Sequence, residues 1–556
     1  MSDIVSVSPE VRESFAPILS VLERARAELA PQPDVAAVRP GYKYPPGGAP
    51  EPALIVAVTP GTQPVTGTAL SAKYGVPVVV EDATVEEQMA RLASAAPVSF
   101  ATPAGPTASA FEDLISGEAL IAFAPPKSGT YEPPDPPNLP LVEEAMGLTV
   151  CVSPEAGWSE LETFLSATQA SLTVAMYQFT APHIFEAVEA AVKPEGRKFE
   201  LVLHPIPEPP AHSGVKANDL AEQSGVIDPL EAEMHDRFEM AWATLLTKAH
   251  PDGLWASAYH IKVAVRDGSA MWLSSGNWQS TNQPDVHPFE PSGKVPPGFQ
   301  RKYNRDYHAI IVNDRLASIY EQYIKRDHDL SAAQAGDAQS FALPDLFVPE
   351  EEEEPEAFAA PPRFFQPLRL NRKVSVQPLL TPDNYAEHAL ALIRSAKESV
   401  WFQNQYINFR GTDEDFPEFK LLVTALKDQI DAGREVRIIC RDLMKQESLD
   451  ILVALGFPPQ TFRFQPACHN KCVIVDKSVV MFGSHNWSNE GVKTNRDASL
   501  IFDDKEIAEY LAEVYDYDWT RLATAHPQKA RPRVAKPGEE TPEGFTRVAF
   551  SAMFDD

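Results

Sequence analysis

Two short stretches of this chain repeat the same residue types at the same spacing. Each has a histidine, a lysine two positions later, an aspartate five positions further on, and then a serine and an asparagine. The two sets are His260, Lys262, Asp267, Ser275 and Asn277, and His469, Lys471, Asp476, Ser484 and Asn486. Because the offsets match at every position, they indicate an internal duplication. Imidazoles can attack phosphorus or transfer protons, and lysines can neutralise phosphate charge, so together the copies predict two halves of one phosphodiester site.

Each motif is expected on a β-hairpin, because apolar and β-branched residues surround the histidine and lysine. Asp267-Gly268 is typical of a two-residue hairpin turn, which would place Ser275 opposite His260. The same count in the second copy would place Ser484 opposite His469.

The two motif aspartates are expected to have a different role from the histidines and lysines. Asp267 and Asp476 lie five residues beyond the lysines, about 16 Å along an extended strand. At that distance neither carboxylate reaches the same phosphate easily. We therefore interpret both as turn or structural residues.

The duplicated pattern resembles the signature of the phospholipase D superfamily, H-x-K-x4-D followed by x6-G-S-x-N. The second copy matches it in full, including Gly483, whereas the first has Ser274 where the family usually has glycine. Family members also carry N-x-E a little downstream, whose acid holds the histidine ring. Asn304-Arg305-Asp306 and Asn495-Arg496-Asp497 occupy that place, with aspartate one methylene shorter than glutamate.

The residue chemistry and this resemblance together imply a role for each side chain. Family precedent favours His260 as the nucleophile that forms a phosphohistidine, with His469 as the acid and base, although the sequence does not separate the two. Asp306 and Asp497 would fix the ring tautomers, and Ser275 and Ser484 could add donors. The groups expected to bind the non-bridging oxygens are Lys262, Lys471, Asn277 and Asn486.

No metal or cofactor is expected for this chemistry. Cys468 and Cys472 flank the second histidine, but strand alternation places them on the opposite face from His469 and Lys471. We therefore interpret both cysteines as packing residues. The 4 cysteines of the chain show neither zinc spacing nor a disulfide framework.

Composition limits the remaining possibilities. The chain has 556 residues and a net charge of −30, which does not favour a broad nucleic-acid surface. Arginines and lysines near the motifs, such as Arg305 and Arg496, could be ordinary solvated charge or a local funnel for anions. No apolar run approaches the length of a membrane span, and no signal peptide is visible, so a cytoplasmic protein is expected. Because both motifs lie in one chain, we expect a monomer.

The order of the expected elements predicts the α/β class, because strands alternate with helices in both copies. From the resemblance we expect two phospholipase D-like α/β lobes with mixed sheets, related by pseudo-twofold symmetry, plus a small N-terminal α/β domain. The predicted units are an N-terminal domain of unknown role (1–145), a first repeat (146–330), an acidic Pro/Ala-rich linker (331–372), a second repeat (373–525) and a poorly ordered C-terminal tail (526–556).

The resemblance leaves the substrate open, since the superfamily includes enzymes acting on several phosphodiesters. We favour hydrolysis of a phospholipid, because both motifs lie in one long acidic chain with additional loops around them. A metal-independent nuclease acting on DNA or RNA is the main alternative. A catalytically silent interaction platform is the alternative from another class.

Overall fold

The computed structural model describes most of the chain. The described residues are 5–45, 47–62, 66–95, 110–116, 129–205, 227–246, 250–291, 293–334, 346–349, 362–409, 417–526, 531–536, 539–542 and 545–548.

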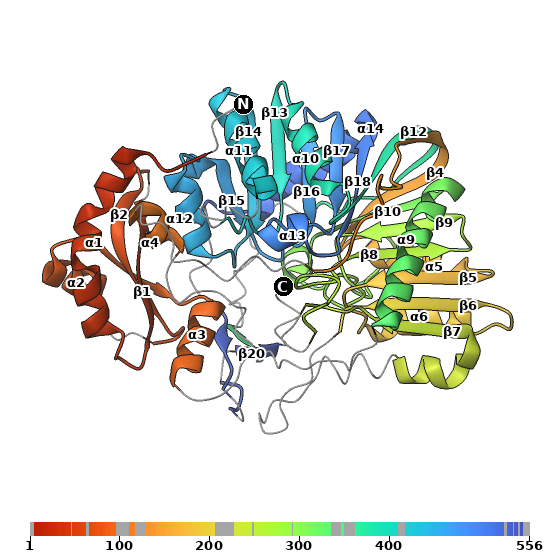
Figure 1. Ribbon diagram of the computed structural model, residues 1–556, viewed down its shortest axis with the longest axis horizontal. Coiled ribbons are helices and arrows are strands. Elements are labelled where there is room, and N and C mark those ends of the chain that lie inside the picture. The colour runs from red at the N-terminus through yellow and green to blue at the C-terminus, as the bar shows by residue number, and fades with distance from the viewer. Residues whose placement is uncertain are drawn as a thin grey trace.

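A small α/β domain forms the N-terminal part of the structure. Its sheet has the order β1-β2-β3, with β1 antiparallel and β3 parallel to the central strand. Figure 1 shows this domain beside the second lobe, and Tyr44 Oη donates to Asp450 of that lobe at 2.7 Å. Its elements are α1 (Pro9–Leu29), β1 (Val35–Lys43), β2 (Glu51–Val58), α2 (Gly67–Tyr74), β3 (Val78–Asp82), α3 (Val85–Ala95) and α4 (Ala110–Ser116).

Both repeats form α/β lobes, as predicted, but their strands join into one 14-stranded sheet. The order is β15-β14-β13-β16-β17-β18-β12 in the second lobe, followed by β4-β10-β9-β8-β5-β6-β7 in the first. The two halves are the same arrangement in reverse, as a pseudo-twofold axis between β12 and β4 requires. These two long strands pair antiparallel from Leu368↔Val150 to Val376↔Val142.

The strands of the first lobe are β4 (Val142–Ser153), β5 (Ser171–Met176), β6 (Lys198–Leu203), β7 (Phe238–Trp242), β8 (Lys262–Arg266), β9 (Ala270–Ser274) and β10 (Asp306–Val312). Those of the second lobe are β12 (Leu368–Leu380), β13 (Ser399–Gln403), β14 (Glu435–Arg441), β15 (Phe462–Gln465), β16 (Lys471–Val475), β17 (Val479–Gly483) and β18 (Ala498–Asp503).

Helices cover both lobes, and two of them contribute to a core that the lobes share. α9 and α14 each begin at a side-chain cap, where Asn313 accepts from the Leu316 N–H and Asp504 from the Ile507 N–H. Their apolar stripes pack into one hydrophobic cluster with strand residues of both lobes. The helices are α5 (Gly157–Ser166), α6 (Pro182–Val192), α8 (Phe299–Lys302), α9 (Asp314–Ala333), α10 (Tyr385–Arg394), α11 (Pro417–Asp431), α12 (Gln446–Ala454), α13 (Asn489–Lys493) and α14 (Lys505–Tyr517). None of the described helices is long and apolar enough to cross a membrane.

The motif hairpins form, but the predicted register is wrong by one residue. Arg266 pairs with Ala270, not with Ser269, so the turn contains three residues instead of two. Asp267 and Gly268 both adopt positive φ in it, 54° and 60°. The second hairpin is closed in the same way. Since a one-residue shift moves a side chain to the other face of a sheet, Ser275 does not lie opposite His260.

The C-terminal segment was expected to be poorly ordered, and for part of it this is wrong. β19 (Arg533–Val534) and β20 (Phe545–Val548) pair on either side of β11 (Leu346–Pro349), which lies within the predicted linker. Leu346 and Val534 of this small sheet are buried against Val85 and Met89 of the N-terminal domain. This burial of apolar surface explains why the segment is ordered there.

Candidate active site

Each motif histidine is hydrogen-bonded to an aspartate of the other lobe. Nδ1 of His260 lies 2.7 Å from Oδ1 of Asp497, and Nδ1 of His469 lies 2.6 Å from Oδ1 of Asp306. Both histidines are 2% exposed, and both aspartates are fully buried. The crossed pairs bring the two halves of the predicted site to one place between the lobes.

The backbone explains why the pairs cross. Before β8, Tyr259 forms a parallel bridge with Arg496, and the His260 N–H donates to the Arg496 carbonyl at 2.7 Å. The second copy does the same, since Cys468 bridges Arg305. Each Asn-Arg-Asp segment therefore runs beside the residue preceding the opposite histidine, which places its aspartate next to that ring.

Serine side chains hold the two aspartates. Ser275 Oγ donates to Asp306 Oδ1 at 2.8 Å, and Ser484 Oγ donates to Asp497 Oδ1 at 2.7 Å. Asn282, which the sequence analysis did not select, donates through Nδ2 to Asp306 Oδ2 at 2.9 Å. Asn282 has no motif spacing that would have identified it.

The aspartates remain ionised despite complete burial. Burial alone would raise the pKa of Asp306, but the nearby His469 and Lys471 outweigh it and hold that pKa well below its usual value. The pKa of Asp497 is likewise lowered, because His260 and Lys262 outweigh its burial. An ionised carboxylate accepts a hydrogen bond from Nδ1–H, so the neutral ring presents its lone pair on Nε2.

The predicted lysines and asparagines are buried around the same centre. Lys262 Nζ donates to the His260 carbonyl at 2.8 Å and lies 5.1 Å from the centroid of the Tyr177 ring. Lys471 is 3% exposed. Asn277 and Asn486 are buried as well, two residues after the serines that hold the aspartates.

The two motif aspartates lie at the hairpin turns, where they accept backbone hydrogen bonds. Asp267 accepts from the N–H groups of residues 169–171, at 2.6 Å from Ala170. Asp476 accepts from residues 397–399 at 2.8–2.9 Å. Each therefore ties a hairpin turn to the start of β5 or β13, which is a structural position.

The expectation that Arg305 and Arg496 are surface charges or part of an anion funnel is wrong, because both are fully buried in ion pairs. Arg305 contacts Glu155 of its own lobe at 2.6 Å and Asp518 of the other lobe at 3.1 Å. Arg496 contacts Asp383 of its own lobe and Asp327 of the other, both at 2.7 Å. Each arginine thus links the lobes directly beside a catalytic candidate.

Two further buried histidines, His308 and His485, are structural. Burial lowers the pKa of His308 to about 4 and of His485 to about 3, so both are neutral near pH 7. His308 lies 2.8 Å from the hydroxyls of both Ser153 and Ser274. Ser274 is the departure from the glycine of the family pattern, and this hydrogen bond shows how the first lobe uses it.

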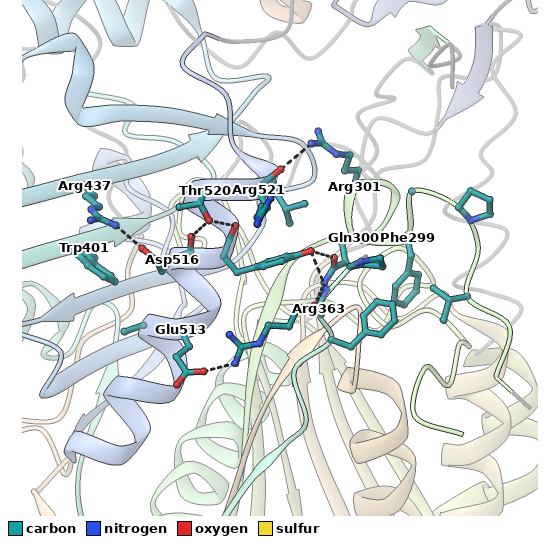
Figure 2. A pocket seen from close by; sticks show the side chains of 18 of the residues that line it. Phe299, Gln300, Arg301, Arg363, Trp401, Arg437, Glu513, Asp516, Thr520 and Arg521 are labelled. Atoms are coloured by element: carbon teal, nitrogen blue, oxygen red, sulfur yellow. Dashed lines mark hydrogen bonds and ion pairs between the residues drawn. The ribbon is translucent and has the colours of Figure 1, made fainter. Parts of the chain in front are cut away.

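Within the described part of the chain, no group of three or more His, Cys, Asp or Glu side chains is arranged to hold a metal ion. A hollow of about 1430 Å³ lies elsewhere among the described residues (Figure 2). It is lined mainly by residues 295–301, 362–364 and 509–522, and it includes none of the motif histidines, lysines or asparagines. Arg437 lies there, with Asp516 as its ion-pair partner (Figure 2).

Comparisons with known proteins agree with the motifs. Residues 389–519 match the family model for the cardiolipin synthase, PLD-like domain. Cardiolipin synthase A of Pseudomonas entomophila is 25% identical over 191 residues, 29% of this chain and 38% of that protein. Mitochondrial cardiolipin hydrolase of Canis lupus familiaris is 35% identical over 65 residues, 11% of this chain and 26% of that protein. The matches thus span well under half of these relatives.

Among solved structures, phosphatidylserine synthase of Haemophilus influenzae aligns with 71% of this chain and 91% of its own at 12% identity, with a TM-score of 0.46. Nuc of Salmonella typhimurium, a phospholipase D family member, aligns with 29% of this chain and 99% of its own at 23% identity, with a TM-score of 0.22. With both motifs and the matched domain, the chain belongs to the phospholipase D superfamily.

Proposed function

We propose that this protein is a phosphodiesterase of the phospholipase D type that hydrolyses a phospholipid through a covalent phosphohistidine. The observation that supports this most directly is the pair of crossed His–Asp hydrogen bonds, at 2.7 and 2.6 Å. They orient two imidazoles, from opposite lobes, that can act on one phosphate as nucleophile and as proton donor.

In the first step Nε2 of neutral His260 attacks phosphorus, and an N–P bond forms as the bond to the leaving oxygen breaks. His469, as the imidazolium held by Asp306, donates its Nε2 proton to that oxygen. Lys262 and Lys471, with the motif asparagines, stabilise the charge that builds on the non-bridging oxygens.

In the second step His469 removes a proton from water, whose oxygen attacks phosphorus while the N–P bond breaks. This regenerates neutral His260 and releases a phosphate monoester. His469 is protonated again for the next cycle. The same intermediate could pass to an alcohol instead of water. The similarity to cardiolipin synthase A supports such a transfer as a second candidate.

The test compares substrates on wild type, His260→Ala and His469→Ala, with His526→Ala as a matched control because that histidine is exposed. Wild type and the control should turn over bis(p-nitrophenyl) phosphate repeatedly, and the two motif variants should not. Undiminished activity in His469→Ala would contradict its assigned role.

Vesicles of phosphatidylcholine or phosphatidylglycerol are then compared with single- and double-stranded DNA, with and without added glycerol. Release of the headgroup supports the lipid substrate, and formation of phosphatidylglycerol from phosphatidylcholine and glycerol supports transfer. Cleavage of DNA alone would replace the lipid proposal with the nuclease. Inactivity of wild type on all these substrates would favour an interaction platform.

A further inference from the structure

The two lobes present different side chains beside their histidines. In the first lobe Met176 pairs with Lys262, and Tyr177 follows, next to His204 at the end of β6. In the second lobe Gln403 pairs with Cys472. Because the strands are antiparallel, the next residue, Asn404, lies opposite Lys471. Gln405 and Arg441 then take the places of Tyr177 and His204. The pseudo-twofold symmetry of the fold is therefore broken next to the site.

The wall of the first lobe is aromatic and adds no charge. The Tyr177 ring centroid lies 5.0 Å from that of His260 and 4.4 Å from that of His204. His204 Nδ1 accepts a hydrogen bond from the Tyr259 N–H at 3.2 Å. Burial lowers the pKa of His204 to about 3, so the ring is neutral.

The wall of the second lobe is cationic. Arg441 is 7% exposed, and its Nε and Nη1 are buried without a hydrogen-bond partner among the described residues. Gln465 is its in-register neighbour on β15. Buried guanidinium N–H groups without an acceptor are costly, so this arrangement is suited to an oxygen-bearing anion.

The amide of Gln465 is oriented so that it adds a donor to the same place. Its Oε1 accepts from Gln403 Nε2 at 2.8 Å, and that same nitrogen donates to Asp518 at 3.1 Å. With Oε1 engaged there, Gln465 Nε2 is directed away from Gln403 and has no partner among the described side chains. Arg441 and Gln465 thus present unmet donors from adjacent strands on one face of the sheet.

We propose that Arg441 and Gln465 form a second oxyanion subsite, which binds a phosphate that the substrate carries in addition to the one being cleaved. β14, β13 and β16 are consecutive strands, so two strand spacings, about 10 Å, separate Arg441 from the strand of His469. Diphosphatidylglycerol, a lipid with two phosphates joined by glycerol, has this chemistry. This inference rests on the proposed function and specifies its substrate class.

A kinetic test uses Arg441→Met with Arg437→Met as the matched control. Arg437 lies on the same strand and face, but it faces the remote hollow with Asp516 (Figure 2). We expect Arg441→Met to lower the ratio of kcat/KM for diphosphatidylglycerol to that for phosphatidylglycerol at least tenfold, and Arg441→Lys to restore part of it. Arg437→Met should leave the ratio unchanged. An unchanged ratio in Arg441→Met, or an equal fall in the control, would overturn the subsite.

A binding test separates this inference from the proposed function. Crystals of the full chain are soaked in tungstate, an oxyanion similar to phosphate, and the tungsten atoms are located by anomalous scattering. We expect one site between the two motif histidines and another against Arg441 and Gln465, the latter lost in Arg441→Met. Absence of that second site in wild type would overturn the inference even if the enzyme is active. Its presence in a protein inactive on lipids would support the subsite and refute the lipid substrate.

Discussion

The crossed pairs predict that an aspartate of one lobe sets the tautomer and stabilises the charged form of the histidine in the other lobe. Asp→Asn substitutions test this. In Asp306→Asn both carboxylate oxygens have donors, since Oδ1 faces His469 and Oδ2 faces Asn282. Either orientation of the new amide therefore points an NH2 group at another donor. We expect kcat to fall by about 10⁴-fold, as when a triad acid becomes an amide.

Asp497→Asn should be milder. Oδ1 of Asp497 accepts from both His260 and Ser484, whereas Oδ2 has no partner among the described residues. An asparagine can keep its oxygen in the Oδ1 position and lose only the negative charge. Because the imidazolium then lacks an ionised partner, we expect a loss of about 10²-fold, about 2.7 kcal/mol.

The assay is the burst of p-nitrophenol from bis(p-nitrophenyl) phosphate, followed by mass spectrometry of the trapped enzyme. This leaving group needs little acid, so a variant with a damaged acid/base histidine should release about one equivalent and accumulate the phosphohistidine. With His260 as nucleophile, Asp306→Asn should show the burst, and His260 should be phosphorylated.

One pattern in this assay is independent of which histidine is the nucleophile. A variant that shows the burst has lost the aspartate that pairs with the acid/base histidine. If the pairs cross, that aspartate lies in the lobe of the other histidine, which is the nucleophile. The substituted aspartate and the phosphorylated histidine therefore always lie in the same lobe. A burst variant whose phosphorylated histidine lies in the other lobe would refute the crossed pairing.

Three further predictions concern stability, each measured by urea unfolding. Arg496→Met should cost about 3–5 kcal/mol, because Asp327 loses a buried counter-ion, and adding Asp327→Asn should recover part of it; equal losses in both variants would contradict this. Asp476→Ala should cost about 1–2 kcal/mol through its lost backbone hydrogen bonds while kcat stays within about twofold, and a large fall in kcat would assign this residue to the chemistry. The pKa of His308 is about 4 and that of His485 about 3, so the unfolded chain binds protons first as the pH falls below ~6.5. Stability should therefore fall from there, by about 3 kcal/mol for His308 and about 5 kcal/mol for His485 once the pH reaches the folded-state pKa. His308→Gln should flatten this slope, and an unchanged slope would count against the assignment.

Local patterns in the sequence were sufficient to predict the fold class. The duplicated motifs and the alternation of strands and helices predicted two α/β lobes, and the structure confirms them. The hairpin register was not predictable from Asp267-Gly268 alone, because three residues rather than two lie between the paired positions Arg266 and Ala270. In that turn Asp267 accepts hydrogen bonds from the backbone of a distant segment, a contact that no local pattern encodes.

The sequence also predicted the residues of the site better than their partners. It selected Asp306 and Asp497 as the acids that hold the histidines, but it contained no sign that the pairs cross. The burial of Arg305 was missed for the same reason, since its partner Asp518 lies 213 positions away. The sequence Asn-Arg-Asp does not show whether its arginine is solvated or buried. The docking of the two lobes determines this.

That docking and the assembly of the site are the same physical event. Each histidine obtains its ionised partner from the opposite lobe, and each buried arginine obtains one of its two counter-ions there. In a lobe on its own, the aspartate and the arginine would each lack the partner that the other lobe now supplies. The duplication is therefore not a redundancy, because neither copy has an oriented histidine until the other is packed against it.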